Sequence, residues 1–109
     1  MELQEAQAIL RNVDKPRSLA SLDTQLTTAL QRALAEFYLL NPHDDVDGKV
    51  GKRTRTAWSV FQENVELPIN GNIDKEGAQQ LINVSKNRFA FIGPPLPVYE
   101  QGFTNFQPF

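Results

Sequence analysis

The stretch VDGKVGKRTRTAWSVFQ, residues 46–62, decides the fold. It opens with an Asp-Gly pair, whose glycine can supply the positive φ that a tight turn requires. Ala57, Val60 and Phe61 then recur at helical spacing. We therefore predict a tight turn followed by a helix over about residues 52–64, which ends at a Leu-Pro pair.

A second stretch, INGNIDKEGAQQL at residues 69–81, aligns with residues 46–58 at a constant offset of 23. Each has an apolar residue, Asp or Asn, Gly, a polar residue and a second apolar residue before a helix. Asp74 can cap the second helix, which we expect to run to about Ser85. The two turns look like one structural device used twice. Their short extended segments could pair, but the pattern does not predict a sheet.

The remaining helices lie N-terminal to the first turn. One apolar face predicts a helix over about residues 22–39, with Ser21 as candidate N-cap and Asn41-Pro42 as its end. Its members recur at intervals of three and four: Leu22, Leu26, Ala29, Leu30, Ala33, Leu34 and Phe37. A shorter pattern, Leu3, Ala6, Leu10 and Val13, predicts an N-terminal helix that we expect to be an appendage to the core.

The predicted organisation is a helical appendage at residues 1–20, a three-helix domain at 21–86 and a tail at 87–109. The tail holds four of the seven prolines and five of the seven phenylalanines. It is too rich in proline for a helix and too aromatic for a fully solvated linker. An extended strap on the helices and a linker to another domain both remain open.

Composition limits the function classes. A chain of 109 residues suits one compact domain, and a net charge of −2 gives no overall attraction to nucleic acid or to anionic membranes. The absence of cysteine excludes disulfides, thiolate nucleophiles and cysteine zinc sites. The N-terminus does not look like a secretory signal, and no segment is apolar enough to span a bilayer. We expect no cofactor.

The segment His43 to Gly48 invites a test for a metal site. Placed on a calcium-binding loop with Gly48 at the sixth position, it puts His43 first and Thr54 last. Calcium prefers an oxygen ligand at the first position and a bidentate Glu at the last, so neither His43 nor Thr54 suits its position. His43 is also the only histidine, and no Ser or Cys motif accompanies it. We therefore predict no metal site and no catalytic residue.

A set of residues spread over about 26–84 resembles the peptidoglycan-binding domain family, the small three-helix modules attached to many bacterial and phage cell-wall hydrolases. The matching residues, in order, are Leu30-Gln31, Leu34, Asp47-Gly48, Val50-Gly51, Thr54, Ala57, Phe61-Gln62, Leu67, Gly71, Ile73-Asp74 and Leu81. The resemblance implies an all-α, compact three-helix bundle, here with an extra N-terminal helix and an extended tail. It also implies that Gln62 braces the adjoining loop.

The sequence departs from the family pattern at four places. Residues 37–45 replace the usual glycine that closes the first helix, and Lys52 stands where proline is frequent. Gly77 replaces a threonine, and Trp58 replaces an aliphatic residue.

The candidate ligand-binding residues surround the predicted start of the second helix of the domain: Asp47, Lys49, Lys52, Arg53 and Trp58. A helix N-terminus with cations beside it favours an anion, such as a carboxylate of a peptidoglycan stem peptide. The competing interpretation is a solvated face, neutralised by neighbouring aspartates. Trp58 could stack on a sugar, but at the edge of the apolar arc it fits better as a half-buried core residue.

The resemblance implies a non-catalytic module that targets an attached or partner activity to peptidoglycan, in the cell wall, the periplasm or the extracellular space. An alternative keeps the fold but uses the C-terminal tail to dock a partner protein. A helix-turn-helix that binds nucleic acid through residues 52–55 is weaker, because the chain is acidic overall.

Overall fold

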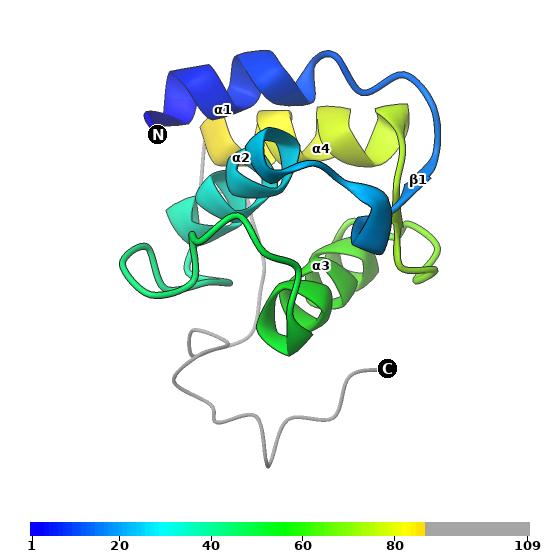
Figure 1. Cartoon of the computed structure of the whole chain (residues 1–109). Coiled ribbons are helices and arrows are strands. Elements are labelled where there is room, and N and C mark those ends of the chain that lie inside the picture. Colours follow the sequence, from blue (N-terminus) through cyan, green and yellow to red (C-terminus); the bar gives the residue numbers. More distant parts are fainter. Residues whose placement is uncertain (87–109) are drawn as a thin grey trace.

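A computed structural model describes residues 1–86 as a mostly helical globule (Figure 1). The interpretations of residues 87–109 as strap, linker or docking tail fall outside the described residues. The described part contains α1 (Leu3–Leu10), β1 (Arg17–Ser18), a 3₁₀ turn (Leu19–Ser21), α2 (Thr24–Glu36), α3 (Lys52–Asn64), β2 (Asn72–Ile73) and α4 (Lys75–Lys86). The expected fold, three core helices preceded by an N-terminal helix, is confirmed. No helix among these residues is long and apolar enough to cross a membrane.

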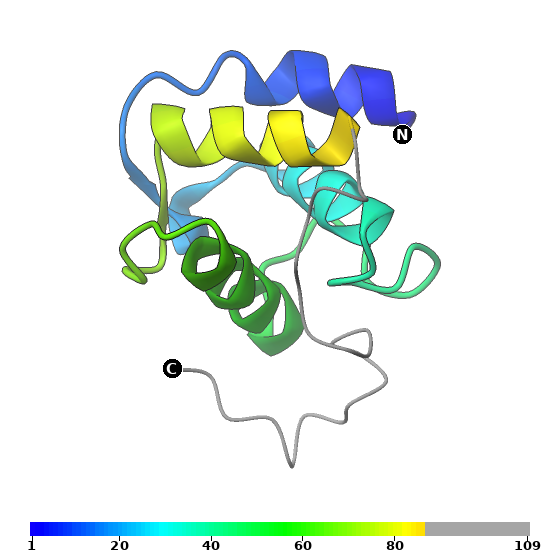
Figure 2. The ribbon, with the colours of Figure 1, turned by 180° about the vertical axis from the view of Figure 1, so that it is seen from behind.

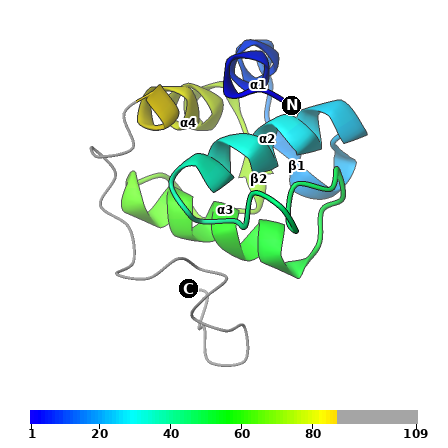
Figure 3. The ribbon, with the colours of Figure 1, turned by 90° about the vertical axis from the view of Figure 1, so that its left-hand side faces the viewer.

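Helices α1 and α4 lie side by side next to α2, and α3 packs on the opposite side of α2 (Figures 2 and 3). One buried apolar cluster joins all four helices and includes Leu10, Leu30, Phe61 and Leu81. The expectation that the N-terminal helix is an appendage is therefore wrong, since its apolar face fills part of the common core. A buried hydrogen bond from Gln7 Nε2 to Ser85 Oγ, at 2.9 Å, adds a polar link between α1 and α4.

Helix α2 is shorter than its apolar pattern suggested. Its N-cap is Asp23, whose Oδ1 accepts from the backbone N–H of Leu26 at 2.8 Å, and not Ser21, which belongs to the preceding 3₁₀ turn. The helix ends at Glu36 because Tyr38 adopts a φ of 66°. The apolar pattern continues past Glu36 since Phe37, Leu39 and Leu40 remain in the core although the helix has ended.

The two core helices α2 and α3 end in the same way. The N–H of Leu39 donates to Leu34 O, and the N–H of Leu67 donates to Gln62 O. In each case the preceding residue has positive φ, 66° at Tyr38 and 60° at Glu66, which is the Schellman arrangement. Tyr38 thus takes the place of the closing glycine that the family pattern favours.

The two turns predicted from the repeat are confirmed. Gly48 and Gly71 have φ values of 77° and 71°. The segment after Gly71 forms β2, which pairs with β1 in antiparallel register, Arg17 opposite Ile73 and Ser18 opposite Asn72. The residues that enter α2 are therefore tied to the second turn.

Candidate functional site

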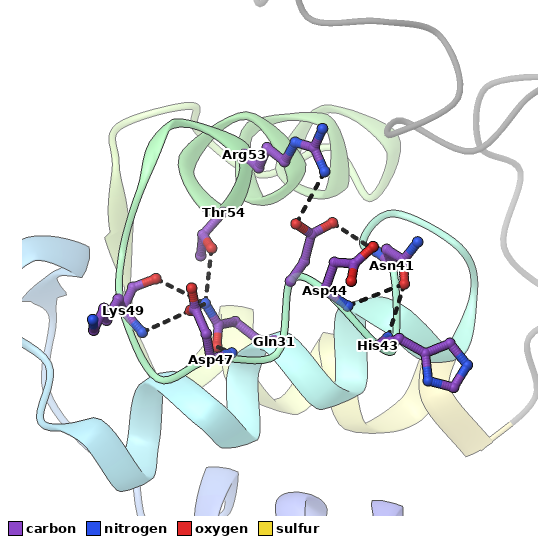
Figure 4. Close-up of polar contacts among 9 residues, drawn as sticks. Gln31, Asn41, His43, Asp44, Asp47, Lys49, Arg53 and Thr54 are labelled. Atoms are coloured by element: carbon purple, nitrogen blue, oxygen red, sulfur yellow. Dashed lines mark hydrogen bonds and ion pairs between the residues drawn. The ribbon is translucent and has the colours of Figure 1, made fainter.

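The side chain of Gln31 holds the first turn in place (Figure 4). It is fully buried on α2 and points into the turn that precedes α3. Its Oε1 accepts from the backbone N–H groups of Asp47 (3.1 Å) and Gly48 (2.9 Å). Its Nε2 donates to Asp47 Oδ1 (3.1 Å), Lys49 O (2.9 Å) and Thr54 Oγ1 (3.0 Å). One carboxamide thus fixes the geometry of the turn and of the start of α3.

Gln62 plays the equivalent part at the second turn. Its Nε2 donates to Asn70 Oδ1 and to Asn72 O, both at 3.2 Å. The bracing role implied by the family resemblance is confirmed. The second brace is weaker, however, because Gln62 Oε1 is buried without a hydrogen-bond partner in the described part of the chain.

Asp47, a candidate ligand-binding residue, directs its carboxylate into the turn. Besides the contact with Gln31, Oδ1 accepts from the backbone N–H of Lys49 at 3.0 Å. That backbone hydrogen bond is the main reason that the pKa of Asp47 lies below its ordinary value. Partial burial acts in the opposite direction, and the N–H of Gln31 lowers the pKa further. The carboxylate therefore serves the conformation of the turn.

The lowered pKa of Asp47 predicts an acid-dependent loss of stability that Asp47→Asn should remove. In the unfolded chain the carboxylate keeps its ordinary pKa of 3.8, so on acidification it takes up a proton before the folded form does. Its stabilising contribution is thus complete well above pH 3.8 and disappears as the pH falls through the lower folded value. Asparagine can keep the turn, since Asn70 accepts the equivalent bond from the N–H of Asn72.

Urea unfolding over a series of acidic pH values measures this effect. The free energy of unfolding should fall less steeply for Asp47→Asn than for the wild type. Asp44→Asn, a change at an exposed neighbour, should follow the wild-type curve. If the free energy of unfolding falls equally steeply with acidification for Asp47→Asn and the wild type, the carboxylate contributes nothing to stability.

Arg53 is positioned by an ion pair with Asp45. Arg53 Nη1 lies 3.2 Å from Asp45 Oδ1, and the two side chains are 48% and 8% exposed. Asp45 Oδ2 also accepts from the backbone N–H of Asn41 at 2.9 Å, and Asn41 Oδ1 accepts from the N–H groups of His43 and Asp44 (Figure 4). The aspartate-rich segment is thus a turn anchored to α3. Among residues 1–86, no three His, Asp or Glu side chains are placed to hold a metal ion.

The start of α3 differs chemically from the start of α4. The first N–H groups of a helix lack partners within the helix, and at α4 the Oδ1 of Asp74 accepts from the N–H of Gly77 at 2.7 Å. The residue equivalent to Asp74 is Gly51, which has no side chain to cap α3. Lys49 and Lys52 are exposed beside it, and neither forms an ion pair with another described residue. The start of α3 is therefore the more attractive of the two for an anion.

Trp58 lies in the core, with 0% of its surface exposed, so the expectation that it is only half-buried is wrong. Its ring stacks on Phe61 at a centroid distance of 5.3 Å, and its Nε1 donates to Asn72 O at 2.8 Å. A Cβ added at Gly77 would come within 3.2 Å of Cζ2 of Trp58. Trp58 and Gly77, which both depart from the family pattern, are therefore in contact, and the missing side chain of the glycine leaves space for the indole. The ring cannot stack on a sugar in this conformation.

The structure divides the five candidate residues. Lys49 and Lys52 gather at the uncapped start of α3, and Arg53 lies there with its guanidinium on Asp45. Asp47 and Trp58 serve the turn and the core. Sequence reasoning missed Gln31 as the organiser of the site. The available signal was its repeat at Gln62, each glutamine following a large apolar residue and preceding a turn.

A model of the family described as "Putative peptidoglycan binding domain" matches residues 23–81. This region includes α2, α3, both turns and the first half of α4. No curated protein and no solved structure gives a significant match. Because the family match covers more than half of the 109 residues and contains both glutamine-braced turns, the chain belongs to the peptidoglycan-binding domain family.

Proposed function

We propose that the protein is a non-catalytic module that binds peptidoglycan through the start of α3 and thereby targets an attached or partner activity to the cell wall. The recognised group is a carboxylate of a stem peptide. It meets the first N–H groups of α3 and the ammonium groups of Lys49 and Lys52. Modest affinity is sufficient, because a tethered partner then meets its substrate at high effective concentration.

The contrast between the two turns carries this proposal. Both turns have a glycine at positive φ and a buried glutamine that hydrogen-bonds to them, but only the second helix is capped by its own carboxylate, Asp74. At the first turn, Gly51 leaves the equivalent place open and nothing lies within 4 Å of a Cβ built there. Gln31 holds the surrounding backbone, so a ligand carboxylate would meet a preorganised site.

The variant Gly51→Asp should separate binding from folding. Gly51 has an extended backbone, φ −111° and ψ −169°, which aspartate adopts readily. The new carboxylate would cap α3 as Asp74 caps α4, which we expect to stabilise the protein by a few tenths of a kcal/mol. It would also occupy the anion site and repel the ligand carboxylate. Co-sedimentation with purified sacculi at low salt should show about tenfold weaker binding, a change of about 1.4 kcal/mol.

A pair of lysine variants supplies the matched control. Lys52 and Lys75 are the first residues of α3 and α4, and both are exposed. Lys52→Gln should weaken sedimentation with sacculi, whereas Lys75→Gln should not, although both remove one positive charge. Equal losses for the two variants would indicate nonspecific charge attraction. Wild-type protein that stays entirely in the supernatant at low salt would show that the proposed function is wrong.

A further inference from the structure

A second candidate site lies between the end of α1, the connection to β1 and the start of α2, in a cleft of about 260 Å³. Its apolar lining comes from Ile9, Val13 and Leu26. Val13 and Leu26 belong to the buried core, and Ile9 packs against it. Much of the lining precedes residue 23, where the family match begins. The cleft thus depends on the N-terminal segment of this chain.

The mouth of the cleft carries two opposite charges and two amides. Arg17 and Asp23 are exposed, as are Asn12 and Gln25. The backbone of Arg17 is fixed by pairing with Ile73, while its guanidinium makes no ion pair among residues 1–86. The Oδ1 of Asp23 caps α2, and its Oδ2 has no hydrogen-bond partner within the described residues. The guanidinium of Arg17 therefore keeps N–H donors for a ligand, and the carboxylate of Asp23 keeps an acceptor oxygen. Both side chains extend from backbone that is held in place.

This combination defines the chemistry of a ligand. Ligand pockets usually measure about 300–1,000 Å³, so this cleft, which is slightly smaller, admits a short segment and not a folded partner. The apolar lining suits small aliphatic groups such as methyls, and side-chain amides can pair with peptide bonds. Arg17 presents a guanidinium fork to a carboxylate. The carboxylate of Asp23 accepts from a peptide N–H and keeps the ligand carboxylate on the Arg17 side.

We propose that the cleft binds the free carboxyl-terminal end of a short alanine-containing peptide, with the terminal carboxylate on Arg17 and the alanine methyl groups against Val13 and Leu26. The inference rests on the proposed function only for the source of this peptide, the peptidoglycan stem. The cleft shares no residue with the start of α3. The protein would therefore contact stem peptides at two separate places.

Titration of ¹⁵N-labelled protein with N-acetyl-L-lysyl-D-alanyl-D-alanine tests the site by NMR. The tripeptide should shift the backbone amide signals of residues 9–17 and 23–26. The same tripeptide with an amidated C-terminus should bind about tenfold more weakly, because it lacks the carboxylate that makes a charge-assisted bond with Arg17. Shifts confined to residues 49–55, or no shifts at millimolar peptide, would overturn the inference.

Variants at two exposed arginines make the test specific. Arg17→Gln should weaken tripeptide binding about tenfold, and Arg11→Gln, at a residue that does not line the cleft, should leave it unchanged. Cleft shifts produced by chitotetraose and not by the tripeptide would reassign the cleft to glycan and overturn the peptide proposal.

Sedimentation of the same variants with sacculi keeps the two proposals apart. If wild-type protein binds sacculi but not the tripeptide, only the cleft inference fails. If it binds the tripeptide but not sacculi, the proposed function fails and the peptide site stands.

Discussion

Replacing Gln31 with leucine is expected to lower the free energy of unfolding by about 3–5 kcal/mol. The buried carboxamide accepts from two backbone N–H groups of the turn and donates to Asp47, Lys49 and Thr54. Leucine removes all five contacts, and several of the partner groups are buried or partly buried and lose a hydrogen bond. The first turn and the start of α3 should loosen together, so binding to sacculi should fall as well.

Gln62→Leu is the matched control for this prediction. Gln62 makes two longer bonds, and its buried Oε1 already lacks a partner, so removing the amide also removes an uncompensated polar atom. We expect a loss of only about 1 kcal/mol. Urea unfolding followed by the fluorescence of Trp58 measures both variants. Similar losses at the two positions would show that the extra contacts of Gln31 carry no weight.

Replacing Trp58 with alanine is expected to cost about 3–5 kcal/mol. The substitution empties a fully buried site, ends the stacking on Phe61 and leaves the carbonyl of Asn72 without the indole N–H. Trp58→Phe keeps an aromatic ring and should cost less, although it also loses the hydrogen bond. Because Trp58 is the only tryptophan, circular dichroism is the suitable probe of unfolding. A loss below about 1 kcal/mol for Trp58→Ala would place the ring at the surface.

A double-mutant cycle should show that Trp58 and Gly77 are coupled. The Cβ of alanine at position 77 would stand 3.2 Å from the indole, so Gly77→Ala forces the neighbouring atoms to shift. In a Trp58→Leu background the crowding by the indole disappears, the close approach to Asp74 Oδ1 stays the same, and the higher helix propensity of alanine remains. Gly77→Ala should therefore be more favourable in that background by about 1 kcal/mol. Additive effects would indicate that the two residues do not influence each other.

The local features of the fold were readable from the sequence. The bounds of α3, the positive φ of Gly48 and Gly71, and the cap at Asp74 all agree with the expected pattern. Each depends on residues within a few positions of one another, where spacing and turn chemistry act directly. The cationic start of α3 was also found in this way, because the helix itself places Lys52 there.

Other features depended on contacts between distant segments. Ser21 and Asp23 are both good N-caps in isolation, and the 3₁₀ turn that packs Leu19 into the core decides between them. The spacing of apolar residues predicted α1 but not its partners, which are α2 and α4. Gln31 lies 16 residues before Asp47, so no local rule connects their side chains.

The sequence by itself determined the helices, the repeated turn and the family, because short-range periodicity and glycine geometry specify them. Only the tertiary structure decided which polar and aromatic side chains remain available to a ligand. Trp58 packs in the core beside Gly77, and Gln31 hydrogen-bonds to the carboxylate of Asp47 in the turn. Neither contact follows from residue type, because the burial of Trp58 and the hydrogen bond between Gln31 and Asp47 exist only once the helices have assembled.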